Sequence, residues 1–401
     1  MTTWLERWRA TPSYQGTLPL CPVYRSKATG REDVDLAALC AVERTLTLAP
    51  EDGFTEFEVK DVPEEMPERW CYLATALPEY DPEERKPREI AQALVQELRC
   101  YLVRFWDSGR RKVMFCSGGL DSRIVAWVLA GLRDEWGRGW LGDITFICHH
   151  PEGEQFRVAM RQMGWREGEY YIHREDHPQD ADYYDLGDFA RNANGYYGLT
   201  WAFWQDAITQ EEEEEAVLIT AGFGGEVLNY PLRQGVKPNR FAAAFLLINQ
   251  PLLGGLWGQL YLNWHDILTP FLGYEYLDTA LRLPAGCFIR APGLRTTSGR
   301  QPDLMRPLML EEASGTPAAE HPPVHWGHRY DFTVSRERAA YLRQCWRASR
   351  LYRDFKHLDW VRDAKPCAPT GLREVLWGRD SKLYSYATMY EHVHRGDRIK
   401  Q

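Results

Sequence analysis

The hydrophobic and polar positions in the middle of the chain alternate between two periods. Short apolar runs typical of buried strands occupy residues 112–117, 143–150, 169–175 and 216–222. Between these runs, apolar residues recur at helical spacing over residues 122–136, 153–164 and 199–210. Strands that alternate with helices predict a parallel sheet with right-handed crossovers, so we expect an α/β, Rossmann-like fold in this region.

The flanking segments have other patterns. Apolar residues at helical spacing predict a helix over residues 88–109, and the period-two alternation of residues 54–62 predicts a strand in a small N-terminal α+β region. Residues 77–87, LPEYDPEERKP, have the charged, proline-bearing composition of a linker, and the pattern beyond about residue 230 is mainly helical. We therefore predict three parts, with bounds 1–85, 86–300 and 301–401.

One apolar segment has nearly the length of a membrane span. Residues 241–264 are interrupted by Asn249, Gln250 and Pro251, which favours two buried helices over a span. The N-terminus lacks the long apolar core of a secretory signal, and the nine cysteines form no CxxC pair. An odd number of cysteines suits a reducing compartment, so we expect a cytoplasmic protein without membrane contact. The net charge of −9 argues against a broad nucleic-acid-binding surface.

The stretch CSGGLDSR, residues 116–123, lies between the first predicted strand of the sheet and the helix after it. Its glycines permit tight turns, and successive N–H groups with a helix N-terminus form an anion cradle to which Ser117 and Ser122 can add donors. Asp121 would repel a phosphate directly, so its useful role is to hold Mg²⁺ between carboxylate and phosphates. The stretch has neither the Gly-Lys-Ser/Thr ending of a Walker A loop nor the GxGxxG spacing.

The SGGLDS stretch is similar to the SGGxDS pyrophosphate loop of N-type ATP pyrophosphatases, whose members cleave ATP between the α- and β-phosphates. Two further stretches resemble the asparagine synthetase-like branch, which includes β-lactam synthetase and lasso peptide cyclase. VLITAGFGGEVLN, residues 217–229, resembles the strand and acidic glycine-rich turn of that branch, and LTPFLGYEYLDTALRLP, residues 268–284, resembles its PFL segment. The resemblance covers about residues 70–300.

The resemblance implies an AMP-forming ligase that uses ATP and Mg²⁺, adenylates a small-molecule or peptide carboxylate and joins it to an amine. It assigns Mg²⁺ to Asp121 and Glu226, and it leaves Arg290 and Arg295 as the nearest cations in place of the lysine that the family has after its Leu-Pro pair. It implies adenine against the second strand, near Ile147. The residues implied to contact the nucleotide are Cys116, Ser117, Gly118, Gly119, Leu120, Asp121, Ser122, Ile147, Ala221, Gly222, Phe223, Gly224 and Gly225.

The chain departs from the family pattern in several places. Thr2 stands where asparagine synthetase has its glutaminase cysteine, and the short segment before the loop implies that residues 1–85 are a reduced or degenerate glutaminase-like remnant. Phe223 stands where asparagine synthetase has a glutamate, and Thr269 and Gly273 replace the arginine and aspartate that flank PFL. Two alternatives therefore stay open: a catalytically degenerate nucleotide-binding scaffold, and a pyrophosphatase that modifies tRNA or nucleobases.

Overall fold

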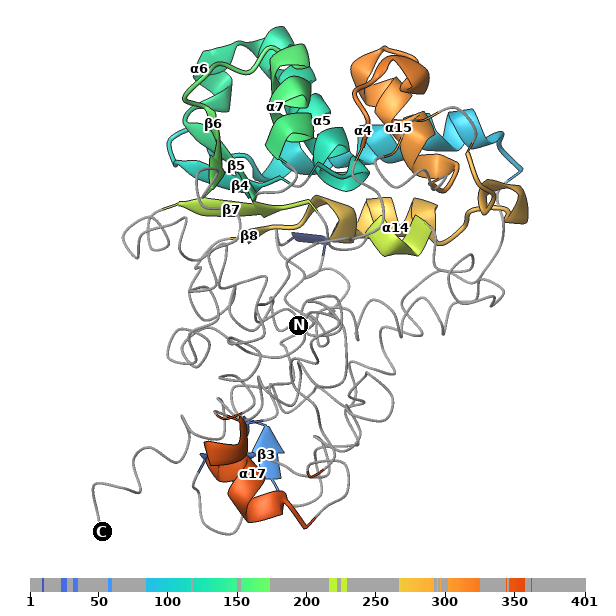
Figure 1. Cartoon of the computed structure of the whole chain (residues 1–401). Helices are drawn as coiled ribbons and strands as arrows, with labels where there is room; N and C mark the ends of the chain where they lie inside the picture. The colour runs from blue at the N-terminus through green and yellow to red at the C-terminus, as the bar shows by residue number, and fades with distance from the viewer. Residues whose placement is uncertain are drawn as a thin grey trace.

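The chain has an α/β fold built on a Rossmann-like parallel sheet, as Figure 1 shows. The computed structural model describes residues 9–10, 23–26, 32–34, 57–59, 84–116, 118–149, 153–173, 216–221, 225–228, 267–291, 294, 296, 302–324, 344, 346–357 and 362. The predicted helices over residues 199–210 and 241–264 lie outside these residues.

Five parallel strands form the main sheet, in the order β6-β5-β4-β7-β8. Their bounds are β4 Lys112–Phe115, β5 Ile144–His149, β6 Tyr170–His173, β7 Val217–Thr220 and β8 Ile267–Leu268. The four strands predicted from apolar runs are thereby confirmed. The fifth strand, β8, was not predicted, because a two-residue strand is too short to carry a periodic pattern.

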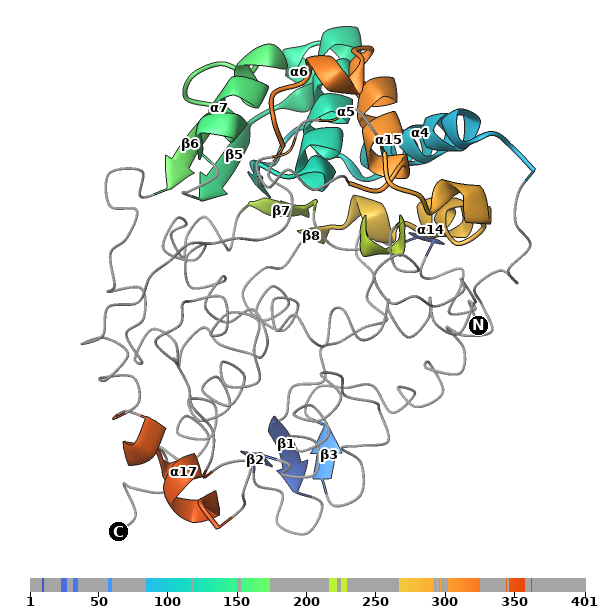
Figure 2. The same cartoon turned by 45° about the vertical axis from the view of Figure 1, so that its right-hand side comes forward.

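The helices next to the sheet also match the predicted periodicity. Helix α4 is Pro87–Phe105, α5 is Leu120–Trp136, α6 is Arg138–Leu141 and α7 is Gly153–Gln162. Figures 1 and 2 show α4, α5, α7 and α15 (Met305–Ser314) together on one side of the sheet. The remaining described helices are α14 Tyr274–Ala280, α17 Arg350–Phe355, and the short 3₁₀ helices η3 Gly225–Leu228, η4 Pro270–Leu272, η5 Ala285–Cys287 and η6 Ala318–Glu320.

A second, smaller sheet belongs to the N-terminal region. Strands β1 Val23–Ser26, β2 Glu32–Val34 and β3 Phe57–Val59 pair antiparallel in the order β2-β1-β3. Strand β3 lies at the centre of the strand predicted over residues 54–62, which is confirmed. The proposed domain bounds stay predictions. No helix among the described residues is long and apolar enough to cross a membrane.

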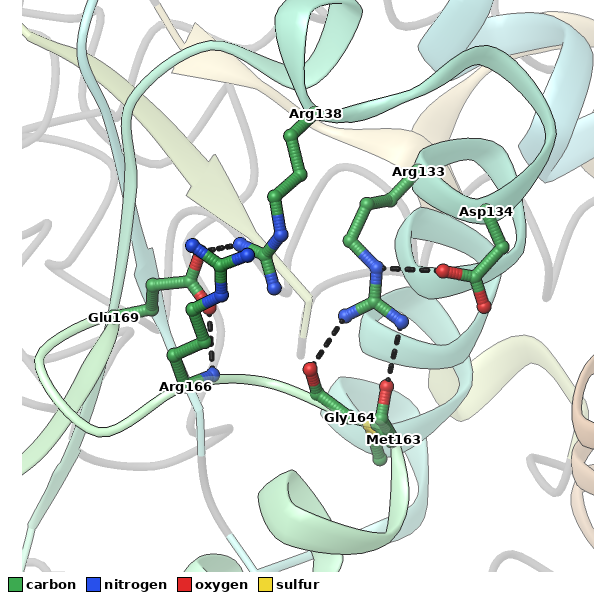
Figure 3. Close-up of polar contacts among 7 residues, drawn as sticks. All are labelled: Arg133, Asp134, Arg138, Met163, Gly164, Arg166 and Glu169. Carbon is green, nitrogen blue, oxygen red and sulfur yellow. Dashed lines mark hydrogen bonds and ion pairs between the residues drawn. The ribbon is translucent and has the colours of Figure 1, made fainter.

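Two arginines, the buried Arg133 and the half-buried Arg138, hold the far end of α5 in place. Arg133 donates hydrogen bonds to the carbonyl oxygens of Met163 (2.9 Å) and Gly164 (3.1 Å), and its Nε lies 2.7 Å from Oδ1 of Asp134 (Figure 3). In the same view, Arg138 binds the carboxylate of Glu169. These contacts join α5 and α6 to the turn after α7, so the helix that carries the SGGLDS motif has a rigid base.

A buried lysine begins the central strand, at the end of the sheet opposite to that motif. Lys112 is 1% exposed, its Nζ donates to the carbonyl oxygen of Leu141 (3.2 Å), and it lies 4.8 Å from the centroid of the Trp106 ring. Burial lowers the pKa of Lys112 from its ordinary 10.5 to about 8, against the opposing effect of the Asp107 and Asp143 carboxylates.

This lysine should make folding depend on pH. Between about pH 8 and pH 10.5 the unfolded chain keeps the Lys112 proton and the folded chain releases it. The free energy of unfolding should therefore rise with pH in this window, relative to Lys112→Met, by at most about 1.4 kcal/mol per pH unit. Urea unfolding at several pH values measures the slope, with the exposed Lys356→Met as the control. Parallel pH profiles for the protein and Lys112→Met would contradict the assignment.

Candidate functional site

The strand order places the candidate site between β4 and β7. Strands β5 and β6 lie in turn on one side of the central strand β4, and β7, the next strand in the sequence, lies on the other side of β4. Ligands of such sheets bind beyond the carboxyl ends of the strands, at the point where the order reverses. Phe115 of β4 pairs with Thr220 of β7, so both strands end at one level. The first and fourth strands of the alternating region are therefore neighbours.

The SGGLDS motif spans the end of β4 and the start of α5. The amide of Cys116 donates to the carbonyl oxygen of Ile147 (2.8 Å), which extends the pairing of β4 with β5. Gly119 is the N-cap residue, so Leu120, Asp121 and Ser122 form the first turn of α5, two residues earlier than predicted. Leu120 and Ser122 are buried, while Asp121 is partly exposed. The positive end of the α5 dipole thus faces the switch region, where an anion is favoured.

Two of the buried residues implied to contact the nucleotide have a packing role in the described structure. Burial raises the pKa of the Cys116 thiol well above its usual range, so this cysteine is a small apolar residue and no nucleophile. Ile147 is buried within β5, two residues before the carboxyl end of the strand. Contact of either with a nucleotide stays a prediction.

Asp121 lies where the loops after β4 and β7 meet. A Cβ atom built on Gly225, the first residue of η3, would lie 2.8–2.9 Å from the carboxyl atoms of Asp121. Only a glycine permits this approach of the backbone after β7 to the carboxylate. The SGGLDS stretch and the glycine-rich turn after β7 are therefore in direct contact, although Asp121 and Gly225 lie more than a hundred positions apart in the sequence.

A buried arginine binds Asp121 from a third element. Nε of Arg306, in α15, lies 2.5 Å from Oδ1 of Asp121. Its Nη1 lies 2.6 Å from Oδ2 of Asp303, and its backbone amide donates to Oδ1 of Asp303 at 3.1 Å. Sequence reasoning missed Arg306, although one signal was present. It is the only charged residue of the apolar run LMRPLML, three residues after an aspartate.

The position of Asp303 depends on the segment that contains Arg290. Arg290 and Asp303 form an antiparallel bridge, with Ala291 N donating to Pro302 O (3.0 Å) and Leu304 N to Ile289 O (2.9 Å). The side chain of Arg290 is exposed. Its backbone thus helps to hold the pair formed by Asp303 and Arg306, and the proposed electrostatic role of its side chain remains a prediction.

Several predicted site residues lie wholly or partly outside the described part of the chain. Glu226 belongs to η3 by its backbone, next to Gly225, but its side chain is outside the described part of the chain. Ala221 is buried directly after β7. The remaining predicted residues outside the described part are Ser117, Gly222, Phe223, Gly224 and Arg295.

The PFL segment packs against α4. Its three residues form the buried η4, and the amide of Thr269 donates to the phenol oxygen of Tyr101 at 2.8 Å. A Cβ atom on Gly273 would lie 2.9 Å from the Tyr101 ring. Thr269 and Gly273, which replace the charged residues of the family, therefore both contact one tyrosine. They serve to dock the segment on α4.

The donor set at the switch point suits a magnesium ion bound together with phosphates. Mg²⁺ prefers carboxylate oxygens and is usually held by one or two carboxylates plus substrate phosphates. The side chain of Asp121 is 21% exposed and belongs to the first turn of α5. No group of three or more His, Cys, Asp or Glu side chains that could hold a metal occurs in the portion of the chain that is described.

Comparisons with known proteins add little to this geometry. No protein family model matches the chain, and no curated protein matches it. Twenty-six chains of solved structures match, among them NAD+ synthetase from Burkholderia pseudomallei. That match has 16% identity and a TM-score of 0.25, and it covers 62% of this chain and 99% of the synthetase. The fold described above therefore rests on the sheet itself.

Proposed function

We propose that the protein is an AMP-forming carbon–nitrogen ligase that adenylates a carboxylate, releases pyrophosphate and joins the acyl group to an amine. One observation carries the proposal: the SGGLDS motif begins α5 at the switch point, and Gly225 of the turn after β7 touches its aspartate. This combination suits ATP cleavage between the α- and β-phosphates, in keeping with the resemblance to asparagine synthetase-like pyrophosphatases.

The backbone around α5 has the charge to bind the leaving group. The N–H groups of the SGGLDS stretch and the positive end of the helix would bind pyrophosphate. Asp121 and Glu226 would hold Mg²⁺, which neutralises charge that develops on the departing pyrophosphate. Donors that are already oriented lower the barrier because they need no rearrangement as that charge appears.

The reaction has two steps. A carboxylate oxygen of the first substrate attacks the α-phosphorus of ATP, and the bond from that phosphorus to the bridging oxygen breaks as pyrophosphate leaves. The amine then attacks the acyl carbon of the adenylate, loses a proton, and displaces AMP. Holding both substrates at the switch point would supply much of the acceleration.

One specific observation supports the alternative of a catalytically degenerate nucleotide-binding scaffold. Because Arg306 already binds Asp121 at 2.5 Å, the aspartate has a structural partner that does not depend on a nucleotide. A protein that kept this contact only for stability could bind ATP without turning it over. The modification of tRNA or nucleobases has no such support and is weakened by the net charge of −9.

Exchange of radiolabelled pyrophosphate into ATP tests the proposal directly. The full chain, with Mg²⁺ and pools of amino acids or short peptides as carboxylates, should show exchange with at least one pool and none when EDTA replaces the metal. Calorimetric binding of ATP without exchange in any pool would favour the scaffold. No binding of Mg·ATP at all would refute both readings.

A further inference from the structure

The three charged side chains Asp303, Arg306 and Asp121, here called the α15 triad, connect helix α15 to the candidate site. We infer that Arg306 is a positioning residue, which sets the orientation of the Asp121 carboxylate toward Mg·ATP. This inference rests on the proposed function and extends the site to helix α15, which begins at Met305.

The difference in burial between Arg306 and Asp121 indicates that Arg306 acts on a bound ligand through Asp121. The side chain of Arg306 is 2% exposed and that of Asp121 is 21% exposed. A bound nucleotide can reach the aspartate but not the guanidinium behind it. The role of Arg306 toward a ligand is therefore indirect.

The charges of the triad leave Asp121 able to attract a cation. Asp303 is fully buried and both of its oxygens bind Arg306, so it compensates the charge of the guanidinium. With one cation and two carboxylates, the triad keeps a net charge of −1, at the edge where Asp121 meets solvent. Arg306 can thus orient the carboxylate without cancelling its charge.

The geometry requires an arginine. Nε binds Asp121 while Nη1 binds Asp303, and the planar guanidinium fixes the angle between the two contacts. The triad is also held rigidly, because α15 packs on both α4 and α5 (Figures 1 and 2). A lysine has one nitrogen on a flexible stem and keeps the charge without this fixed fork.

The charge-preserving variant Arg306→Lys separates positioning from charge. The probe is α,β-methylene-ATP, which cannot be cleaved at the bond in question, titrated calorimetrically into the full chain over a series of Mg²⁺ concentrations. Losing the residue that orients a metal ligand typically costs 10- to 100-fold in metal affinity, so the Mg²⁺ concentration for half-maximal binding should rise by roughly that factor. In the Asp121→Asn background, Arg306→Lys should add less than about a twofold change, because two residues of one network are not additive.

Arg133→Lys is the matched control. It removes the fork of another buried arginine of the same core, at the other end of α5, where the guanidinium binds the carbonyl oxygens of Met163 and Gly164 (Figure 3). It should lower the melting temperature without changing the Mg²⁺ requirement. If Arg306→Lys does not fold, Asp303→Asn replaces it, and it should weaken Mg²⁺-dependent binding through lost charge and lost orientation together.

The outcomes distinguish this inference from the proposed function. Failure of the unsubstituted protein to bind the Mg²⁺ complex of the probe overturns the proposed function, and this inference with it. Normal binding with an unchanged Mg²⁺ requirement in the Arg306→Lys or replacement variant overturns the inference alone. The inference is also overturned if Arg306→Lys raises the Mg²⁺ requirement by the same factor in the unsubstituted protein and in the Asp121→Asn variant.

Discussion

Replacing Asp121 by asparagine should reduce Mg²⁺-dependent exchange of pyrophosphate into ATP by on the order of a hundredfold or more, because a charged ligand of the Mg²⁺ that stabilises the leaving group is lost. Asparagine has nearly the same shape, and its amide oxygen can still accept the hydrogen bond from Nε of Arg306. The fold should therefore persist, and the loss should appear in exchange and in Mg²⁺-dependent ATP binding, with little change in far-UV circular dichroism.

Asp134→Asn is the control for this result. Asp134 lies on the same helix, is 69% exposed, and binds Arg133 at the end of α5 far from the motif. It should keep full exchange. If Asp121→Asn retained the affinity for Mg·ATP and the exchange rate of the unsubstituted protein, the metal role of Asp121 would be wrong.

Glu226→Gln is the companion variant of the same experiment. Residue 226 follows Gly225, whose backbone lies against Asp121, and we propose that Glu226 shares the metal of Asp121. Exchange should again fall by on the order of a hundredfold. A glutamate that only stabilises a helix end contributes about 0.3–1 kcal/mol to folding, and its loss would leave exchange unchanged.

Gly225→Ala is the second substitution for which we expect a large loss of pyrophosphate exchange. Its new methyl group would enter the space that the Asp121 carboxylate occupies. The new methyl group would lie 2.8–2.9 Å from the carboxyl atoms, closer than real contacts allow. The carboxylate cannot move away freely, since Nε of Arg306 holds it at 2.5 Å. Either the ion pair or the position of η3 must change, and misplacement of a site by about 1 Å can cost a hundredfold in rate.

Gly286→Ala serves as the matched control for this steric effect. Gly286 also lies in a 3₁₀ helix, η5, and a Cβ atom there would meet nothing within 4 Å. Comparing the exchange rates and melting temperatures of the two variants isolates the contact with Asp121. Equal exchange rates for Gly225→Ala, Gly286→Ala and the unsubstituted protein would show that the turn after β7 is not part of the site.

Local patterns were sufficient for four of the five strands of the sheet. The apolar runs that became β4, β5, β6 and β7 alternate with amphipathic helices, and such alternation leaves few arrangements other than a parallel sheet. The SGGLDS motif was visible for the same reason: its residues are contiguous, and the chemistry of an anion-binding turn is local. The sequence alone therefore led to the fold class and to Asp121.

Contacts between distant segments could not be predicted, because no periodic pattern encodes them. Arg306 meets Asp121 across 185 residues, and Tyr101 meets Thr269 across 168. Strand β8 is too short for its period to be recognised. Lys112 is buried because its strand is central in the sheet and the Trp106 ring lies over its ammonium group. The sequence by itself determined which elements form and where an anion can bind. Only the tertiary structure decided which buried cation holds the Asp121 carboxylate, since packing of α15 on α5 brings that arginine to it.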